Sequence, residues 1–446
     1  MGLLFDAVSY ASALIVVYYS TLFVISLWTT RRTPAASGRS PWFVLVIPAH
    51  NEELVIGQTV RRARELEGNR YSVLIMNDGS SDATSEQARL AAESDQRILV
   101  VDRPAAVAGQ GKGEVLNHAY QLACDMARDG DPRLQGARAE EVVLCIVDAD
   151  GWLEPHALRV VSPYFADPKV AGVQLPVRMW NSRDGFLALM QDMEFIGFSL
   201  FVQAGRDPFN SVGLGGNGQF VRLAALQSLG DRPWSRCLTE DLDLSLSLVE
   251  HGWRNRFCPR ACVAQQALNQ VRPLLRQRTR WTQGHYSCWQ HLPLLWRARG
   301  VALTTRIDLS LYLVLVVFVL VLGGQFTAGM LEWAGLLNPG TSFLSFVHND
   351  HLYRTISLAL SLVPVLGFAV TYQRFAAQRL PLWALPGCLL LFAVYNYAWG
   401  IPASLCALGR TALRRGSWRL LTRSWRPRPP RSPTPLKQQH GQDPHR

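Results

Sequence analysis

Charged residues are scarce in this chain of 446 residues: Asp, Glu, Lys and Arg make up 18% of it, whereas hydrophobic residues make up 48%. Four runs contain no charge at all, residues 7–30, 309–331, 355–372 and 380–409. Each approaches or exceeds the ~18 residues that mark a candidate membrane span. The composition therefore disfavours a fully soluble protein and predicts an integral membrane protein.

The eight cysteines lack the paired spacing of a zinc knuckle or a disulfide framework. Three residues separate Cys258 from Cys262, but no second pair of Cys or His has zinc-ligand spacing. We interpret the cysteines as reduced core residues. The chain also lacks an internal repeat and the spacing of a Walker A phosphate loop, which disfavours a nucleoside triphosphatase.

The first uncharged run differs from a secretory signal, because the basic pair Arg31 and Arg32 follows it and the run is longer than a ~7–15-residue signal core. We predict a retained transmembrane helix over residues 1–32, with the chain after it in the cytoplasm. A second membrane region is predicted over residues 307–409, with spans near 309–331, 355–372 and 380–409. Pro386, Gly400 and Pro402 favour a re-entrant segment or a kinked pair of half-helices in the last of these. The prediction is a multi-pass protein of the plasma membrane.

Positive charge is concentrated at the C-terminal end. Residues 410–446 hold ten Lys or Arg and one Asp, which gives +9 of the formal net charge of +11. Because this tail directly follows a membrane segment, attraction to anionic lipid is a more economical interpretation than binding of nucleic acid. We expect a basic, disordered tail that contacts membrane lipids, and no nucleic-acid partner.

The pattern between the membrane segments is that of an α/β domain. Apolar runs at residues 43–47, 72–76, 98–101 and 142–147 indicate buried strands, with helical stretches at 52–66, 81–93 and 113–128 between them. This alternation predicts a parallel sheet in a cytoplasmic domain over residues 41–271. We further predict a helix from Pro155, a strand at 170–177, helices at 185–202 and 240–251, and an amphipathic helix at the membrane surface within residues 272–300.

Two carboxylates stand where the fourth strand ends, in Asp148-Ala149-Asp150. Ligands of open α/β sheets bind at the carboxyl ends of strands. Paired carboxylates suit a hard divalent cation such as Mg²⁺, which keeps substrate phosphates among its ligands. A solvated turn is the structural alternative.

Polar residues follow the first two strands as well. Pro48-Ala49-His50-Asn51-Glu52 ends the first and Asn77-Asp78-Gly79-Ser80 the second, so both are predicted at the same sheet edge as Asp148. Asp78 is suited to accept hydrogen bonds from a base or a ribose, and an Asx-turn is the alternative. Lys112, between glycines at the start of a helix, suits a phosphate, although a solvated lysine would look the same.

Three later segments have both a functional and a structural interpretation. The glycine cluster at residues 213–218 allows backbone to approach a sugar or pyrophosphate, or forms a tight turn. Thr239-Glu240-Asp241 caps a helix, and it also suits a general base at Asp241 for an acceptor hydroxyl. Gln277, Arg280 and Trp281 share one helix face, where Arg280 suits a diphosphate and Trp281 a sugar ring, or both serve as membrane anchors.

These motifs, in this order and between membrane segments, resemble the membrane-integrated glycosyltransferases of family 2, which include cellulose, chitin, hyaluronan and poly-N-acetylglucosamine synthases. The resemblance implies a GT-A fold inserted between transmembrane helices, and inverting transfer from a nucleotide diphospho-sugar, usually a uridine diphosphate sugar, with Mg²⁺ or Mn²⁺. It implies Asp150 on the metal and Asp241 as the base. The nucleotide sugar would contact Pro48, Ala49, Asn51, Glu52, Asp78, Lys112, Asp148 and Arg280, and the acceptor would contact Asn217, Gly218, Glu240, Gln277 and Trp281.

The chain departs from the larger synthases in two respects. No cellulose-synthase-like gating sequence follows Trp281, and the tail is too short for the cyclic-dinucleotide-binding barrel of some relatives. An elongating β-linked polysaccharide is the acceptor that the sequence favours, with separate export partners as an open question. A single transfer to a lipid acceptor is the nearest alternative, and an inactive permease or scaffold is the alternative from another class.

Overall fold

A mixed seven-stranded sheet forms the centre of the computed structural model, which describes residues 2–32, 34, 40–314, 335–336, 351–377 and 379–412. The sheet has the order β3-β2-β1-β4-β8-β6-β9. Its strands are β1 (Trp42–Ala49), β2 (Tyr71–Asn77), β3 (Ile98–Asp102), β4 (Val142–Ile146), β6 (Val170–Gln174), β8 (Gln219–Arg222) and β9 (Arg254–Phe257). A smaller sheet of β5 (Trp152–Leu153), β10 (Val263–Gln265) and β7 (Val177–Met179) adjoins it.

The central strands are apolar throughout because both faces of the sheet are covered. Phe43, Leu45 and Ile47 of β1 pack into one core, with α2 (Ile56–Arg64), α3 (Thr84–Ala92) and α5 (Ala157–Val161). The alternate residues Val44 and Val46 pack into a second core, with α4 (Lys112–Asp129), α8 (Leu223–Gln227) and α9 (Glu240–Glu250). The result is a three-layer α/β domain.

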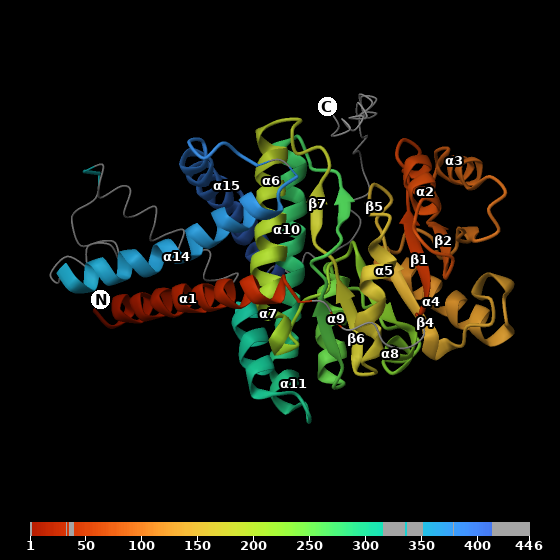
Figure 1. Cartoon of the computed structure of the whole chain (residues 1–446), viewed down its shortest axis with the longest axis horizontal. Helices are drawn as coiled ribbons and strands as arrows, with labels where there is room; N and C mark the ends of the chain where they lie inside the picture. The colour runs from red at the N-terminus through yellow and green to blue at the C-terminus, as the bar shows by residue number, and fades with distance from the viewer. Residues whose placement is uncertain are drawn as a thin grey trace, which may run out of the picture.

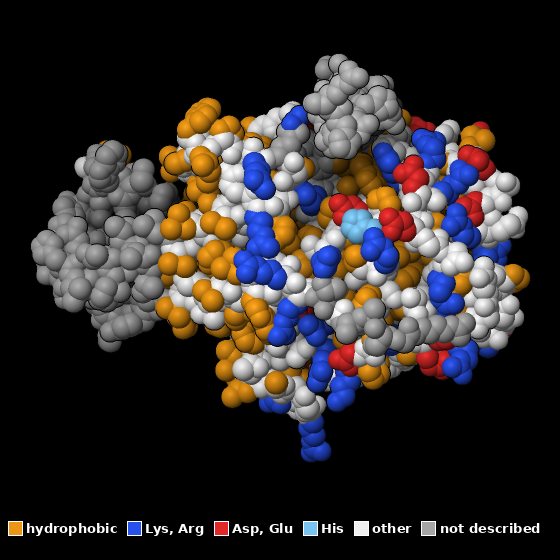
Figure 2. All heavy atoms as spheres, in the orientation of Figure 1, with side chains coloured by type: hydrophobic (Ala, Val, Ile, Leu, Met, Phe, Trp, Pro, Cys, Tyr) orange, Lys and Arg blue, Asp and Glu red, His pale blue; other side chains and the backbone are white. Residues whose placement is uncertain are grey.

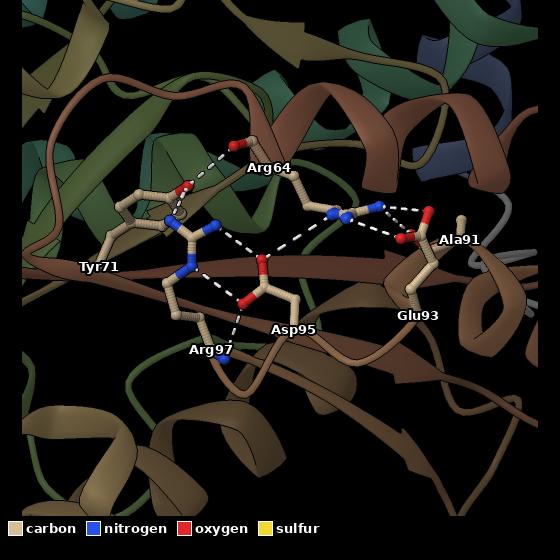
Figure 3. Close-up of polar contacts among 6 residues, drawn as sticks. All are labelled: Arg64, Tyr71, Ala91, Glu93, Asp95 and Arg97. Carbon is tan, nitrogen blue, oxygen red and sulfur yellow. Dashed lines mark hydrogen bonds and ion pairs between the residues drawn. The ribbon is translucent and has the colours of Figure 1, made fainter.

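Ion pairs fasten the outer edge of this domain. Arg64 at the end of α2 donates to the Glu93 carboxylate at 2.7 and 2.9 Å, just after α3 (Figure 3). Arg97 contacts both Asp95, at 2.6 Å, and the hydroxyl of Tyr71 in β2. Two helices are thus tied to the second strand on the side of the domain away from the long apolar helices (Figure 1).

Long helices make up the other part of the molecule (Figure 1). They are α1 (Gly2–Thr29), α6 (Phe186–Gly197) continued by a π-helix (Phe198–Gln203) and α7 (Ala204–Arg206), α10 (Val271–Ser287), α11 (His291–Arg297), α14 (His351–Phe375) and α15 (Leu385–Ala412). In Figure 2 hydrophobic side chains gather over this part, whereas charged side chains cover the sheet domain.

Small residues let these helices cross closely. Thr29 of α1 donates a buried hydrogen bond to the carbonyl of Ala204 at 2.7 Å. At Gly205 of α7 there is no room for a side chain, since a Cβ there would lie 2.5 Å from the carbonyl oxygen of Leu22. Close backbone approach through small residues is typical of helix packing in membranes.

The sheet confirms part of the sequence prediction and corrects part. The predicted parallel strands are present, since β1 pairs in parallel with both β2 and β4. The wholly parallel sheet was wrong: β8 was not predicted, and it runs antiparallel to both β4 and β6. The single strand expected at 170–177 is two strands in two sheets, because Pro176 interrupts it.

Two expectations for helices are corrected as well. The half-helices expected at 380–409 form the continuous helix α15, which contains Pro402. The single amphipathic helix expected after residue 272 is broken at Cys288–Gln290 between α10 and α11. The helix expected at 240–251 is confirmed as α9, and Gly252, with a φ of 84°, follows its end.

Two helices in the described ranges are long and apolar enough to cross a membrane, Phe186–Phe209 and Leu385–Arg410. The window of the first is 61% buried and that of the second 22%. The first is therefore packed like a core helix, and the multi-pass arrangement is not confirmed. Most of the predicted span at 309–331 and the tail after residue 412 lie outside the described residues.

A substitution pair tests the close crossing of α1 and α7. Gly205→Ala should lower the free energy of unfolding by about 1–3 kcal/mol, because the added methyl meets backbone atoms that cannot rotate away. Gly57→Ala, within α2, should leave stability unchanged or raise it by up to ~1 kcal/mol, since its Cβ makes ordinary contacts. Thermal unfolding of both detergent-solubilised variants measures this. Equal melting temperatures would contradict the crossing.

Candidate active site

The loops that follow β1, β2 and β4 are polar and lie at one edge of the sheet. The ends of β1 and β2 are in register, with Ala49 opposite Asn77, and β4 lies on the other side of β1. The loops are hydrogen-bonded to one another, as His50 Nδ1 lies 2.8 Å from the Asp78 carbonyl and Thr59 donates to the Ala149 carbonyl at 2.6 Å. The predicted convergence of three strand ends is therefore present.

Asp78 is a buried carboxylate among the predicted contacts of the nucleotide sugar. Its carboxylate forms a buried ion pair with Arg103, which follows β3, and accepts a hydrogen bond from the Gly109 amide at 3.1 Å. The sequence reasoning missed Arg103. The signal in the sequence was the position of Arg103 directly after β3, the strand that flanks β2.

Lys112 joins two segments of the site. Its ammonium donates to Asp148 and, at 2.7 Å, to the carbonyl of Gly216. Burial lowers the pKa of Lys112, but the charges of Asp148, Glu240 and Asp241 outweigh that effect, so the pKa lies above its ordinary value. Lys112 therefore stays charged and stands among carboxylates from β4 and α9.

Carboxylates crowd the strand ends beside Lys112. Burial, and then the charge of Asp148, raises the pKa of Asp150 to about 7. Burial, and then the charges of Asp150 and Asp148, raises the pKa of Glu52 to about 8. A divalent cation would relieve this repulsion, and oxygen donors suit Mg²⁺ or Mn²⁺, so the residues fit a metal.

The start of α9 places two more acids at the same site. Burial, and then the charge of Asp241, raises the pKa of Glu240 to about 7. Burial also raises the pKa of Asp241, although the amide of Leu242 donates to its carboxylate at 2.8 Å. A Cβ at Gly216 would lie 3.0 Å from Lys112 Nζ and 3.2 Å from Asp241 Oδ2, so glycine there keeps this space open.

The glycine cluster is held as a shaped loop. Asn217 accepts a hydrogen bond from the Asp148 amide at 3.2 Å and donates to Gln265 at 3.2 Å. The Gly218 amide donates to the Ile146 carbonyl at the end of β4, at 2.9 Å. Asn217 therefore fixes the loop against the Asp148 backbone. Gly218 holds the loop to the end of β4 through its backbone.

Helix α10 adds Gln277, Arg280 and Trp281, and it also adds Arg278, which the sequence reasoning missed. Arg278 is 2% exposed, donates to Glu194 of α6 at 2.6 Å and lies 4.3 Å from the Trp281 ring centre. Tyr395 of α15 donates to the same Glu194 carboxylate at 2.9 Å. The carboxylates of Asp192 and Glu194 in a mostly apolar helix were the signal for buried partners such as this cluster.

A cavity of about 410 Å³ connects these elements. Its walls include the predicted residues Lys112, Asp148, Asn217, Glu240, Asp241, Gln277, Arg280 and Trp281. They also include the aromatic side chains of Phe195 and Phe198 from α6 and the π-helix, Tyr312 and Trp399. Arg278 also lines it, and its buried Nε atom has no hydrogen-bond acceptor in the part of the chain that the structure describes.

Some predicted residues lie beside this cavity without lining it. These are Pro48, Ala49, Asn51, Glu52, Asp78, Asp150 and Gly218. The first six belong to the adjoining strand ends. The site thus has a part at the strand ends, rich in carboxylates, and a cavity that runs from α9 toward the apolar helices.

Residues 40–284, more than half of the chain, match the family described as glycosyltransferase like family 2. The chain belongs to this family. This membership supports a glycosyltransferase enzyme rather than a scaffold.

Several curated relatives cover the same region of this glycosyltransferase. The beta-monoglucosyldiacylglycerol synthase of Synechocystis is 30% identical over 250 residues, 55% of this chain and 48% of that protein. The poly-beta-1,6-N-acetyl-D-glucosamine synthase of Staphylococcus aureus is 24% identical over 242 residues, 54% of this chain and 53% of that protein. The glycosyltransferase spans about half the length of the curated relatives it matches.

A solved structure supports the fold. The mannosyltransferase PcManGT of Pyrobaculum calidifontis, in complex with GDP-Man and Mn²⁺, aligns with a TM-score of 0.55 at 17% identity. The alignment covers 92% of this chain and 99% of that one. The GT-A-like α/β fold predicted from the motifs is thereby confirmed.

In the glycosyltransferase, a buried histidine of α11 holds α9 in place. His291 of α11 contacts Asp243 at 3.0 Å and Glu250 at 2.8 Å, both on α9. Burial lowers the pKa of His291, but the two carboxylates outweigh it and raise the pKa to about 9. The charged imidazole thus holds the helix that carries Asp241.

The His291 pair predicts a pH dependence of stability. Because the folded-state pKa exceeds the unfolded value of about 6.5, the stabilisation is fully present below pH ~6.5 and is lost as pH rises through 9. The melting temperature should fall across that window, and His291→Gln should flatten the fall. His251→Gln, on the exposed end of the same region, is the matched control. An unchanged slope in His291→Gln would contradict the role of this pair.

Proposed function

We propose that this glycosyltransferase transfers one sugar, with inversion, from a uridine diphosphate sugar to a hydroxyl group of a membrane lipid. The observation that carries the proposal is the cavity, which joins Asp241 and Lys112 to walls formed by Phe198, Tyr312 and Trp399. Polar donors and acids suit the reacting sugar, and the aromatic side chains in the walls suit an acyl chain. The similarity to a beta-monoglucosyldiacylglycerol synthase points to the same class of acceptor.

The donor is proposed to lie along the strand ends. Asp78 and the backbone at Pro48 and Ala49 would border the nucleoside, and Asn51 and Glu52 would flank the same edge. Asp148 and Asp150 would hold Mg²⁺ or Mn²⁺, with Asp150 as the principal ligand. When bound, the cation supplies positive charge against the diphosphate.

The leaving diphosphate is proposed to be stabilised by two side chains. Lys112 lies against Asp148 and the Gly216 carbonyl, and Arg280 is close enough for its charge to act on Glu240 and Asp241. Both cations line the cavity. Charge-assisted bonds to phosphate oxygens would favour departure of the diphosphate.

Asp241 is the proposed general base. Burial raises its pKa, which makes the carboxylate a stronger proton acceptor while it remains next to the space that Gly216 leaves open. It would take the proton of the acceptor hydroxyl as that oxygen attacks the anomeric carbon. A single displacement from the face opposite the diphosphate inverts the configuration.

The acceptor is proposed to lie between α10 and the glycine loop. Gln277 and Trp281 line the cavity from α10, and Asn217 and Glu240 line it from the other side. The unpaired Nε of Arg278 would donate to an acceptor oxygen. Gly218 would act through the loop that it holds against β4.

Membrane association follows from the exposed apolar side chains of the long helices. They include Leu390, Leu391 and Val394 of α15, Val365, Leu366 and Val370 of α14, and Val17 and Val24 of α1. We propose that α1, the region from residue 307 to 409 and the amphipathic stretch at 272–300 place the cavity at the cytoplasmic side of the plasma membrane, with the basic tail on anionic lipid.

A growing β-linked polysaccharide is the second candidate acceptor. Trp281 offers an aromatic surface at the cavity, and one of the matched relatives is a poly-beta-1,6-N-acetyl-D-glucosamine synthase. The sequence favoured this acceptor. The four aromatic side chains that line the cavity besides Trp281 move the preference to a lipid.

Transfer can be tested with membranes that contain the protein, supplied with Mg²⁺, a panel of labelled nucleotide sugars and a membrane-lipid extract. We expect release of nucleoside diphosphate and a product that enters the organic phase with one sugar attached. Asp241→Asn should lower the rate by about 10²–10⁴-fold without loss of donor binding, because it removes the base.

The control for this test is Asp184→Asn, on an exposed loop, which should leave the rate unchanged. A series of water-soluble products of increasing length would show that the acceptor is a polysaccharide and not a lipid. Full activity of Asp241→Asn would overturn the proposed mechanism.

A further inference from the structure

Two cysteines meet at the boundary between α9 and α10, next to the proposed base. Cys237 lies two residues before Thr239, and Cys288 lies at the end of α10, yet their sulfur atoms are 4.0 Å apart. Cys237 is half-buried and Cys288 is fully buried. The separation of 51 positions hid this contact from sequence reasoning, which interpreted all eight cysteines as reduced core residues.

The surroundings distinguish this pair from the other cysteines. The hydrogen bond with Cys288 lowers the pKa of Cys237 to about 7, and the pKa of Cys288 is raised. In contrast, burial raises the pKa of Cys124, Cys258 and Cys262. A partly exposed, acidic thiol beside a second thiol is the arrangement of a redox-sensitive cysteine and its resolving partner.

We propose that Cys237 and Cys288 form a reversible disulfide that slows glycosyl transfer. The oxidant is a peroxide. The Cys237 thiolate attacks one oxygen of hydrogen peroxide, which breaks the O–O bond, gives a sulfenic acid and releases hydroxide. The Cys288 thiol then attacks the Cys237 sulfur, its proton leaves with the hydroxyl group as water, and the S–S bond forms. An external dithiol reverses the reaction by thiol–disulfide exchange.

The disulfide would move the segment that carries the base. The sulfur atoms must close from 4.0 Å to about 2.05 Å. Thr239 Oγ1 lies 3.6 Å from the Cys237 sulfur and 3.7 Å from the Cys288 sulfur, so it stands against both. A Cβ at Gly284 of α10 would lie 2.6 Å from the same Thr239 oxygen, which leaves no slack on that side. Because Cys237 lies two residues before Thr239 in the chain, its movement toward Cys288 would shift Thr239, and with it the start of α9 and Asp241.

A metal ion bound by Cys237 and Cys288 is the alternative to a disulfide between them. The two sulfurs and a carboxylate oxygen of Asp243 lie within 4.8 Å of one another. The Asp243 carboxylate already binds His291 at 3.0 Å and contacts Gln290 at 3.4 Å. We therefore favour the disulfide, and a bound metal is an outcome that the test must detect.

The bond itself is tested on the full chain in detergent, treated with dilute hydrogen peroxide and digested without reduction. Mass spectrometry should find a Cys237–Cys288 cross-linked peptide, two thiols lost per chain, and recovery of both thiols with dithiothreitol. No activity is needed for this readout, so it stands apart from the proposed function. Absence of the cross-link, or thiols that become reactive only after a chelator, would overturn the disulfide.

The regulatory half of the proposal rests on the proposed function and uses release of nucleoside diphosphate. Peroxide should lower the rate at least several-fold in the natural protein, and dithiothreitol should restore it. Cys237→Ser and Cys288→Ser should keep the basal rate and resist peroxide, whereas Cys124→Ser, at a distant half-exposed cysteine, should remain sensitive. If the serine variants fail to fold, the loss of rate with peroxide and its recovery with dithiothreitol in the natural protein still test the switch. An unchanged rate in cross-linked protein would overturn the switch.

Discussion

Negative charge gathered at the carboxyl ends of the central strands is the constraint on which the site depends. Glu52, Asp148 and Asp150 come from the sheet, and Glu240 and Asp241 come from the start of α9. Burial and mutual repulsion raise the pKa of several of these acids, and Lys112 is the cation placed among them. Such a site is poised for a divalent cation with a diphosphate, since the pair brings both the positive charge and the oxygens that complete the coordination.

Sequence reasoning succeeded where a local pattern determines the outcome. The apolar runs predicted β1, β2 and β4, and the polar residues after them converge because neighbouring parallel strands end at the same edge. It failed where distant segments meet. Strand β8 is short and pairs antiparallel with strands far away in sequence, and Arg103, Arg278 and Cys288 acquire their partners only when the chain folds. Such contacts leave at most a weak signal in the sequence. The carboxylate of Glu194 in a mostly apolar helix is an example.

The apolar helices have a second role beside any contact with lipid. Trp399 of α15 and Phe198 of the π-helix line the same cavity as Asp241, and Tyr395 supports the Glu194 that binds Arg278. π-helical turns are frequent at functional sites, and here one lies between α6 and α7 where α1 crosses. The apolar part therefore lines the cavity in which we propose that the acceptor binds. This arrangement connects the proposed lipid acceptor to the fold.

The most direct test of the central claim is a structure of the full chain with a nucleoside diphosphate and Mn²⁺. The account predicts the metal on Asp150, with the diphosphate beside Asp148 and within reach of Lys112 and Arg280. The nucleoside would then lie along the ends of β1 and β2. A diphosphate bound away from these strand ends, for example in the groove formed by Lys169, Trp253 and Arg254, would contradict the account.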